Sequence, residues 1–314
     1  MYLNAKLVAV LIVSLSGSLL STALVFGQES PKVPSHGNTP FHIEVQDAQG
    51  TRIAGPNIQE TDGKEPSAVL DLEREYKPGD RIIFGGPQRM AVRLDEHMPE
   101  CLVYLASDAG NVTFEIPYGT DEQQTGSAYA PESFAGKSHR VAVRALTKKE
   151  LKGYRNLALN PCDVRSPEQA PPQTFPHSTT NSASRNAFDF ESRNAIDGVT
   201  QNGHHGVWPY QSWGPQLRND LWWKLDFGRT VELDKLRLMV RADFPHDSYW
   251  KSADIEFSDG SHVSVQIGSS AAFQDFSFKK RRVSWLRITN LVSADPAKWC
   301  SFIEVEAWGR DGRF

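Results

Sequence analysis

The strongest constraint on the fold of this chain is a two-residue hydrophobic repeat that recurs in short runs. Apolar side chains fall at every second position over residues 90–94, 112–116 and 223–227. Successive side chains of a β-strand point to opposite faces, so this alternation is typical of strands with one buried face. Turn-forming sequences such as Lys-Pro-Gly-Asp at residues 77–80 separate the runs. The pattern predicts an all-β protein.

The strand-like runs form two groups, which predict two β-sandwich domains. The first group covers residues 39–146, to which we assign no role, and the second covers residues 156–314. Between them, Thr-Lys-Lys-Glu at 147–150 has the pattern of a helix capping box, which predicts a short helical joint over 147–155. A chain of 314 residues is long enough for two cores of ordinary size.

The N-terminus predicts export. Lys6 precedes an apolar run from residue 7 to residue 27, and the polar segment 28–38 that follows suits a linker. We expect residues 1–27 to be a cleaved signal peptide. The alternative is an uncleaved anchor, because residues 7–27 are long enough to tether the chain to a membrane. Either way the remainder is expected to be secreted, periplasmic or on the cell surface.

Charge and motifs exclude several functions. The formal net charge is -4, so no basic field would attract nucleic acid. The sequence has no Gly-x-Ser-x-Gly, His-Glu-x-x-His or Cys-x-x-Cys motif and no glycine-rich phosphate loop. These observations favour a protein without catalytic activity.

Aromatic residues point to a ligand site in the second domain. All 8 tryptophans lie between Trp208 and Trp308, and rings gather with polar side chains in loops 204–214 and 241–250. Sugars present an apolar face and a rim of hydroxyls, which aromatic rings and polar groups together can bind. The candidate ligand-binding residues are Trp208, Tyr210, Gln211, Trp213, Arg241, Asp243, His246, Asp247 and Trp250.

Structural roles are open for several of these candidates. Any of the tryptophans Trp208, Trp213 and Trp250 could instead pack the end of the sandwich. Arg241 could form a structural ion pair with Asp243 or Asp247 rather than contact a ligand. His204 and His205 could ligate a metal, but no third ligand has a suggestive spacing, so we expect exposed loop histidines.

Four motifs in order give residues 156–309 a resemblance to a known family. They are Asn-Leu-Ala-Leu at 156–159, Asn-Ala-Ile-Asp-Gly at 194–198, Trp-Lys-Leu-Asp-Phe-Gly at 223–228 and Ile-Glu-Val-Glu-Ala-Trp-Gly at 303–309. This segment resembles the discoidin domain, the coagulation factor V/VIII type C module of the galactose-binding-like superfamily. Family 32 carbohydrate-binding modules belong to the same group. The resemblance implies a jelly-roll β-sandwich with its ligand site in loops at one end.

The resemblance also implies one structural calcium ion. Its ligands would be the carbonyls of Asn194 and Val199 and the carboxylates of Asp197 and Glu304. The loop after Val199 is longer than is usual in the family and lacks its threonine, so a metal-free Asp-Gly turn is the alternative.

The same resemblance implies a disulfide near the two ends of the domain, between Cys162 and Cys300. Export makes such a bond permissible. Cys101 is expected to be a small buried hydrophobe, and three independent free thiols are the alternative.

The sequence therefore predicts an exported, non-catalytic carbohydrate-binding protein. The alternative is a cell-surface adhesion or structural protein whose discoidin-like domain binds a protein or a lipid headgroup. A third function class is an accessory protein of glycan processing.

Overall fold

The computed structural model describes most of the chain after residue 40. The described residues are 41–56, 58–60, 67–106, 110–118, 125–164 and 171–312. The predicted signal peptide and linker (residues 1–38) lie outside them. Of the described helices, none is long and apolar enough to cross a membrane.

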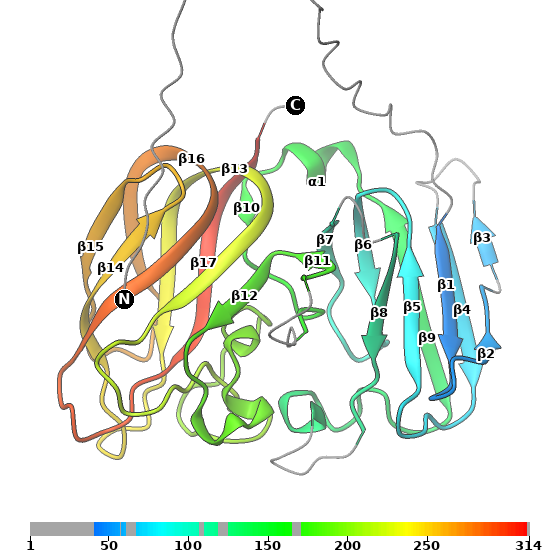
Figure 1. Ribbon diagram of the computed structural model, residues 1–314, viewed down its shortest axis with the longest axis horizontal. Coiled ribbons are helices and arrows are strands. Elements are labelled where there is room, and N and C mark those ends of the chain that lie inside the picture. The colour runs from blue at the N-terminus through cyan, green and yellow to red at the C-terminus, as the bar shows by residue number, and fades with distance from the viewer. Residues whose placement is uncertain are drawn as a thin grey trace, which may run out of the picture. The chain divides into compact units, whose positions relative to one another are not determined.

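The first domain is built from antiparallel sheets (Figure 1). One sheet has the order β2-β1-β5-β8, and the other has the order β11-β7-β6-β9-β4-β3. Their strands are β1 (His42–Gln46), β2 (Arg52–Ala54), β3 (Ile58–Glu60), β4 (Ser67–Glu73), β5 (Arg81–Gly85), β6 (Arg89–Arg93), β7 (Cys101–Leu105), β8 (Asn111–Glu115), β9 (Ser138–Ala145) and β11 (Thr174–Phe175).

The two-residue repeat explains the core of this domain. Along β8, Val112 and Phe114 are buried while the residues on either side of each are exposed. Ile43 and Val45 on β1 and Leu70 on β4 are fully buried in the same hydrophobic cluster. The predicted β-sandwich is confirmed.

A capped helix follows the first domain, as the sequence predicts. The helix α1 (Lys148–Lys152) follows its N-cap residue, Thr147. A short 3-10 helix, η1 (Thr125–Ala128), lies earlier in the chain. The Thr147 hydroxyl accepts a hydrogen bond from the Glu150 backbone N–H at 3.2 Å, and the Glu150 carboxylate accepts one from the Thr147 backbone N–H at 2.8 Å. This reciprocal pair satisfies two donors of the first helical turn.

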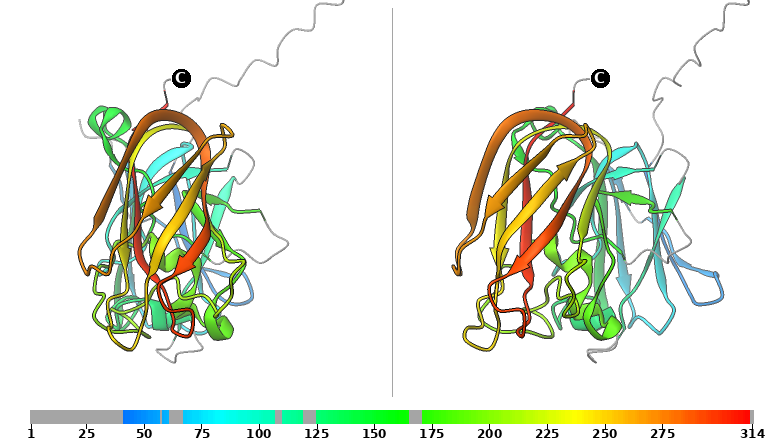
Figure 2. Two further views of the ribbon diagram at one scale, coloured as in Figure 1. Left: turned by 90° about the vertical axis from the view of Figure 1, so that its left-hand side faces the viewer. Right: turned by 60° about the vertical axis from the view of Figure 1, so that its left-hand side comes forward.

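The second domain is an antiparallel jelly-roll sandwich with the order β10-β17-β13-β16-β14-β15, in which β12 also pairs with β13. Figure 2 shows β16 arching over one end of it. Its elements are β10 (Arg155–Asn156), β12 (His177–Thr180), η2 (Ser184–Asn186), η3 (Phe188–Phe190), η4 (Ser192–Ala195), β13 (Trp223–Val240), β14 (Trp250–Phe257), β15 (His262–Gln266), β16 (Gln274–Ser293) and β17 (Phe302–Asp311).

Strand β13 is longer than the run of alternating hydrophobic residues that predicts it. The repeat lapses after Phe227, yet the strand continues to Val240 with irregular pairing between Asp226 and Val231. Gly228 has a φ of 65°, and a Cβ there would lie 2.3 Å from the Phe175 ring. Only glycine fits this combination of positive φ and close approach. A bulge therefore lets one strand curve through the sandwich.

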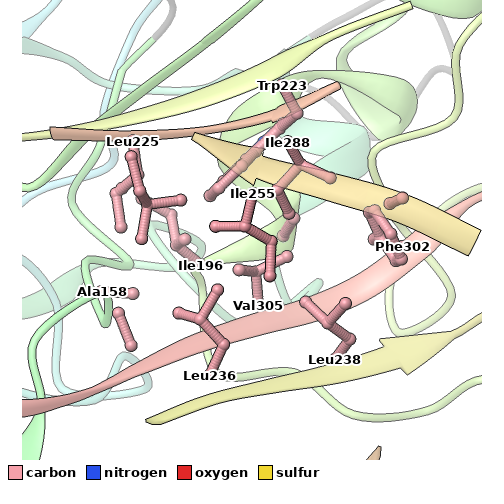
Figure 3. Packing of buried hydrophobic residues seen from close by; sticks show 14 of the residues in the cluster. Ala158, Ile196, Trp223, Leu225, Leu236, Leu238, Ile255, Ile288, Phe302 and Val305 are labelled. Atoms are coloured by element: carbon pink, nitrogen blue, oxygen red, sulfur yellow. The ribbon is translucent and has the colours of Figure 1, made fainter. Parts of the chain in front are cut away.

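The core of the second domain lies between these curved strands. Figure 3 shows side chains of β13, β14, β16 and β17 meeting there, among them Leu225, Ile255 and Ile288. Trp223 is also fully buried, and its indole N–H donates to the Ser192 carbonyl at 3.1 Å. Burying aromatic rings removes a large apolar area from water, which stabilises the fold.

The two domains share backbone and side-chain contacts, and residues 38–314 form one compact unit. β11 follows the expected domain boundary but pairs with β7 of the first domain. Cys162 likewise lies in the first hydrophobic cluster. Strand β11 and Cys162 therefore belong to the sheet and the core of the first domain, although both follow the boundary that the sequence predicts at residue 156.

The predicted Cys162–Cys300 disulfide is wrong in this structure. All three cysteines are free and buried. Cys162 lies in the first cluster together with Cys101, whereas Cys300 lies in the second and is 3.2 Å from the Ser293 hydroxyl. The segment after residue 160 turns back into the first domain, so it does not approach Cys300 as the family resemblance implies.

Candidate functional site

A pocket of about 270 Å³ opens among loops of the second domain. It is lined by Ser184, Arg185, Phe190, His205, Gly214, Arg241, His246, Trp299 and Ser301. These residues come from η2, η3 and the loops that precede β13, β14 and β17. A volume just below the usual range of small-molecule sites, about 300–1,000 Å³, suits one small ligand or one unit of a longer one.

A buried ion pair forms the polar side of the pocket. Arg241 follows the last residue of β13, and its backbone N–H donates to the Ser301 carbonyl at 3.0 Å. Its Nε and Nη2 donate to the two carboxylate oxygens of Asp247, the latter bond measuring 2.9 Å. Both side chains are at most 5% exposed. This two-bond geometry holds the guanidinium plane firmly.

The ion pair leaves donors free to face a ligand. The Nη1 of Arg241 donates to no residue that the structure describes. The buried hydroxyl of Ser301, which lines the same pocket, also has no hydrogen-bond partner among those residues. An unpaired guanidinium nitrogen on a pocket-lining residue can donate to hydroxyl or carbonyl groups of a ligand, whereas the Ser301 Oγ is enclosed by protein atoms.

Trp299 supplies the apolar side, and the sequence analysis did not select it. Its side chain is 37% exposed. Its carbonyl accepts a hydrogen bond from the Ser248 backbone N–H at 2.8 Å, which ties its loop to the loop of Arg241. Neighbouring Lys298 donates to the Pro245 carbonyl at 2.7 Å and adds a second tie. Trp299 lies outside the two aromatic-rich loops 204–214 and 241–250, so the grouping of aromatic residues along the sequence did not indicate it as a ligand contact.

Histidines form one rim of the pocket. The rings of His205 and His246 are stacked, with centroids 4.9 Å apart and planes 4° from parallel. Asp243 lies beside them, with its Oδ2 3.0 Å from the Nδ1 of His205. The structure thus brings the predicted residues Arg241, His246 and Asp247 together, with Asp243 beside the rim.

Three of the other predicted contact residues are buried and lie outside the pocket lining. Trp213 and Trp250 are 0% and 2% exposed, and they stack on each other in the core with ring centroids 5.3 Å apart. Gln211 is 1% exposed and donates to Asp197 at 2.8 Å. None of the three lines the pocket.

Trp208 and Tyr210 are half-buried and do not line the pocket. The backbone N–H of Trp208 donates to the Ser127 carbonyl at 2.8 Å, which anchors the loop to η1. Tyr210 packs near His204, with ring centroids 5.4 Å apart.

Of the residues named for calcium, Asn194, Asp197 and Glu304 are buried, and Val199 is partly buried. Asp197 accepts hydrogen bonds from the Val199 backbone N–H and from Gln211, each at 2.8 Å. Glu304 is 1% exposed and accepts a bond from the Gly198 backbone N–H at 3.2 Å. Asn194 is also buried, and its side-chain amide donates to the Phe188 carbonyl at 2.7 Å.

The electrostatics of this site fit a hard cation. Burial raises the pKa of Asp197 to about 6, while the buried Arg193 guanidinium acts in the opposite direction. Burial and the nearby Asp197 charge raise the pKa of Glu304 well above its usual value. The buried Oε1 of Gln211 has no hydrogen-bond partner among the described residues. Two destabilised carboxylates and an unpaired amide oxygen are the oxygen donors that calcium prefers.

Comparisons with known proteins found no matching family model and no matching curated protein. Solved structures that are similar include chitosan-binding module 1 of a Paenibacillus sp. IK-5 chitosanase/glucanase (20% identity, TM-score 0.35, 49% of this chain and 98% of that one). Another is the Streptococcus pneumoniae fucose binding module SpX-3 (20%, 0.35, 50% and 98%). A third is the lectin domain of lectinolysin complexed with Lewis B antigen (16%, 0.34, 50% and 97%). These neighbours are carbohydrate-binding modules and lectin domains.

Proposed function

We propose that the pocket binds carbohydrate and that the second domain is a non-catalytic sugar-binding module of an exported protein. One observation carries the proposal, namely that the half-exposed Trp299 and the buried Arg241–Asp247 pair line or support the same small pocket. An indole face suits the C–H surface of a sugar ring, and a fixed guanidinium suits its hydroxyls.

The arrangement of carboxylates supports binding rather than catalysis. Hydrolysis of a glycosidic bond needs two carboxyl groups on either side of the bond, one of them free to give up a proton. Both oxygens of Asp247 already accept hydrogen bonds from Arg241. Asp243 is not among the residues that line the pocket, and its Oδ2 lies 3.0 Å from the Nδ1 of His205.

The size of the pocket indicates the ligand class. A volume of about 270 Å³ is suited to a single sugar unit, either free or at the end of a glycan. A small site makes few contacts, and binding must desolvate the hydroxyls of the sugar. We therefore expect a dissociation constant of roughly micromolar to millimolar, which corresponds to a binding free energy of about -8 to -4 kcal/mol.

We also propose one structural calcium ion. Asp197 and Glu304 would hold it, with the carbonyls of Asn194 and Val199 and the unpaired amide oxygen of Gln211 as further ligands. The ion would neutralise two buried carboxylates below the loops that carry the pocket. Export rests on the apolar run 7–27, which lies outside the described residues.

A glycan array compares the wild type with Trp299→Ala. We expect the wild type to bind a defined set of glycans and the variant to lose most of that signal. Trp285→Ala is the matched control, because Trp285 is also only partly buried but lies on β16 away from the pocket. Wild-type binding to no glycan, together with binding to anionic liposomes or a protein, would favour the adhesion alternative.

A further inference from the structure

Basic side chains dominate the polar lining of the pocket. The polar residues in the lining are Arg185, Arg241, His205, His246, Ser184 and Ser301. Among the described residues that line it, none carries a carboxylate or a carboxamide. A guanidinium group only donates hydrogen bonds, and a carboxylate only accepts them. The lining therefore complements a ligand that is rich in acceptor oxygens.

The carboxylates near the pocket are paired with its bases and are not part of its lining. They are Asp247 beside Arg241 (2.9 Å), Asp243 beside His205 (3.0 Å) and Asp189 beside Arg185 (3.8 Å). Each hydroxyl of a neutral sugar has a hydrogen to donate, so a site for neutral sugars needs acceptors as well as donors. In this pocket the carboxylates hold the bases in place, and the lining supplies mainly donors.

Arg185 occupies a backbone conformation that favours glycine. Its φ is 53°, as is that of Asn186, and this left-handed region is unfavourable for residues with a Cβ atom. The side chain is 58% exposed, and its guanidinium carbon lies 5.0 Å from the centroid of the Phe190 ring, which also lines the pocket. Strained residues of this kind gather at ligand sites, where the surrounding structure holds them. The strained turn and the ring together place a charged guanidinium at the pocket.

We propose that the sugar unit bound in this pocket is acidic, with a carboxylate or sulfate group that binds the guanidinium groups of Arg185 and Arg241. The inference rests on the carbohydrate binding proposed above. The planar fork of N–H donors on a guanidinium matches two oxygens of such an anion. Trp299 would contact the C–H face of the same sugar ring. Protonation would make His205 and His246 positive, and an anionic ligand favours that form.

Isothermal titration of the full chain at low salt compares matched acidic and neutral sugars. The acidic sugars are glucuronate, galacturonate and sulfated galactose, and the neutral ones are glucose and galactose. At least one acidic sugar should bind at least about tenfold more tightly than its neutral counterpart, because hydrogen bonds between charged groups are about twice as strong as neutral ones. This preference should shrink at about 1 M NaCl, where charges are screened within about 3 Å, because the Arg185 side chain is largely exposed.

Arg185→Gln removes one positive charge and should reduce the preference to about threefold or less. Arg282→Gln is the matched control, because Arg282 is exposed on β16 and does not line the pocket. Its preference for acidic sugars should equal that of the wild type.

The outcomes separate this inference from the proposed function. Equal affinity for acidic and neutral sugars, tighter binding of glucosamine, or an unchanged preference in Arg185→Gln would overturn the acidic ligand and leave carbohydrate binding standing. Sodium sulfate that binds as tightly as sulfated galactose would also overturn it, because the pocket would then recognise the anion without the sugar. Binding of no sugar in the panel would count against the proposed function itself.

Discussion

Trp213 and Trp299 should respond to substitution in opposite ways, although both are loop tryptophans near the same end of the sandwich. Trp213 is fully buried between Trp250 and Phe302, at ring-centroid distances of 5.3 and 5.9 Å. Its indole N–H donates to the Ser182 carbonyl at 3.0 Å. Trp299 is 37% exposed in the pocket.

The magnitudes follow from these environments. Replacing a buried tryptophan by alanine costs about 3–5 kcal/mol because it leaves a cavity. The lost hydrogen bond to Ser182 adds about 1 kcal/mol, so Trp213→Ala should lose about 4–6 kcal/mol of the free energy of unfolding. That loss approaches the whole stability of many domains, about 5–15 kcal/mol. Trp299→Ala should cost no more than about 1 kcal/mol, as is usual for partly exposed sites.

Urea unfolding followed by far-ultraviolet circular dichroism measures both effects without depending on tryptophan emission. Sugar binding is then measured on the variants that remain folded. If Trp213→Ala does not fold, Trp213→Phe replaces it, with an expected loss of about 1–3 kcal/mol and unchanged sugar affinity. A stable Trp213→Phe protein that no longer binds sugar would refute the assignment of Trp213 to the core.

Three further predictions concern the cation site, the thiols and the capped helix. Millimolar calcium should raise the melting temperature of the wild type but not of Glu304→Gln, since an ion that binds only the native state stabilises it. Because burial raises the pKa values of Cys162 and Cys300, iodoacetamide should modify these thiols only after unfolding, as mass spectrometry would show. The Arg144 guanidinium lowers the pKa of Glu150 to about 2, so the charged pair stabilises the fold above pH about 4.5 and loses this effect as the pH falls towards 2. The stability difference between wild type and Glu150→Gln should therefore shrink in acid, and a constant difference would contradict this.

The sequence predicted the architecture because strand alternation is a local property. The runs at 112–116 and 223–227 became β8 and part of β13. The continuity of β13 was not predictable in this way, because the bulge at Gly228 interrupts the repeat while the backbone pairing resumes beyond it. Register across a bulge is fixed by the neighbouring strands, which the local pattern does not contain.

The site was only partly predictable for a related reason. Arg241 and His246 were identified because they lie in the loop that follows the end of the alternating strand pattern, and both line the pocket. Whether a tryptophan near the loops points outward depends on how distant segments fold over it, which is why the burial of Trp250 and the exposure of Trp299 could not be predicted. The Cys162–Cys300 pairing failed because a turn after residue 160 carries Cys162 into the first domain.

If a sugar binds against Trp299 in the pocket, an NMR titration should detect it at the indole N–H of Trp299. Each of the 8 tryptophans contributes one indole N–H signal, and Trp299→Phe assigns the signal of interest by its loss. During titration with a panel of hexoses, deoxyhexoses and amino sugars, we predict a saturable shift of the Trp299 signal while the buried Trp213 signal stays in place. Saturable sugar binding that leaves the Trp299 signal unmoved, or that shifts the Trp208 signal instead, would show that the sugar does not bind against Trp299.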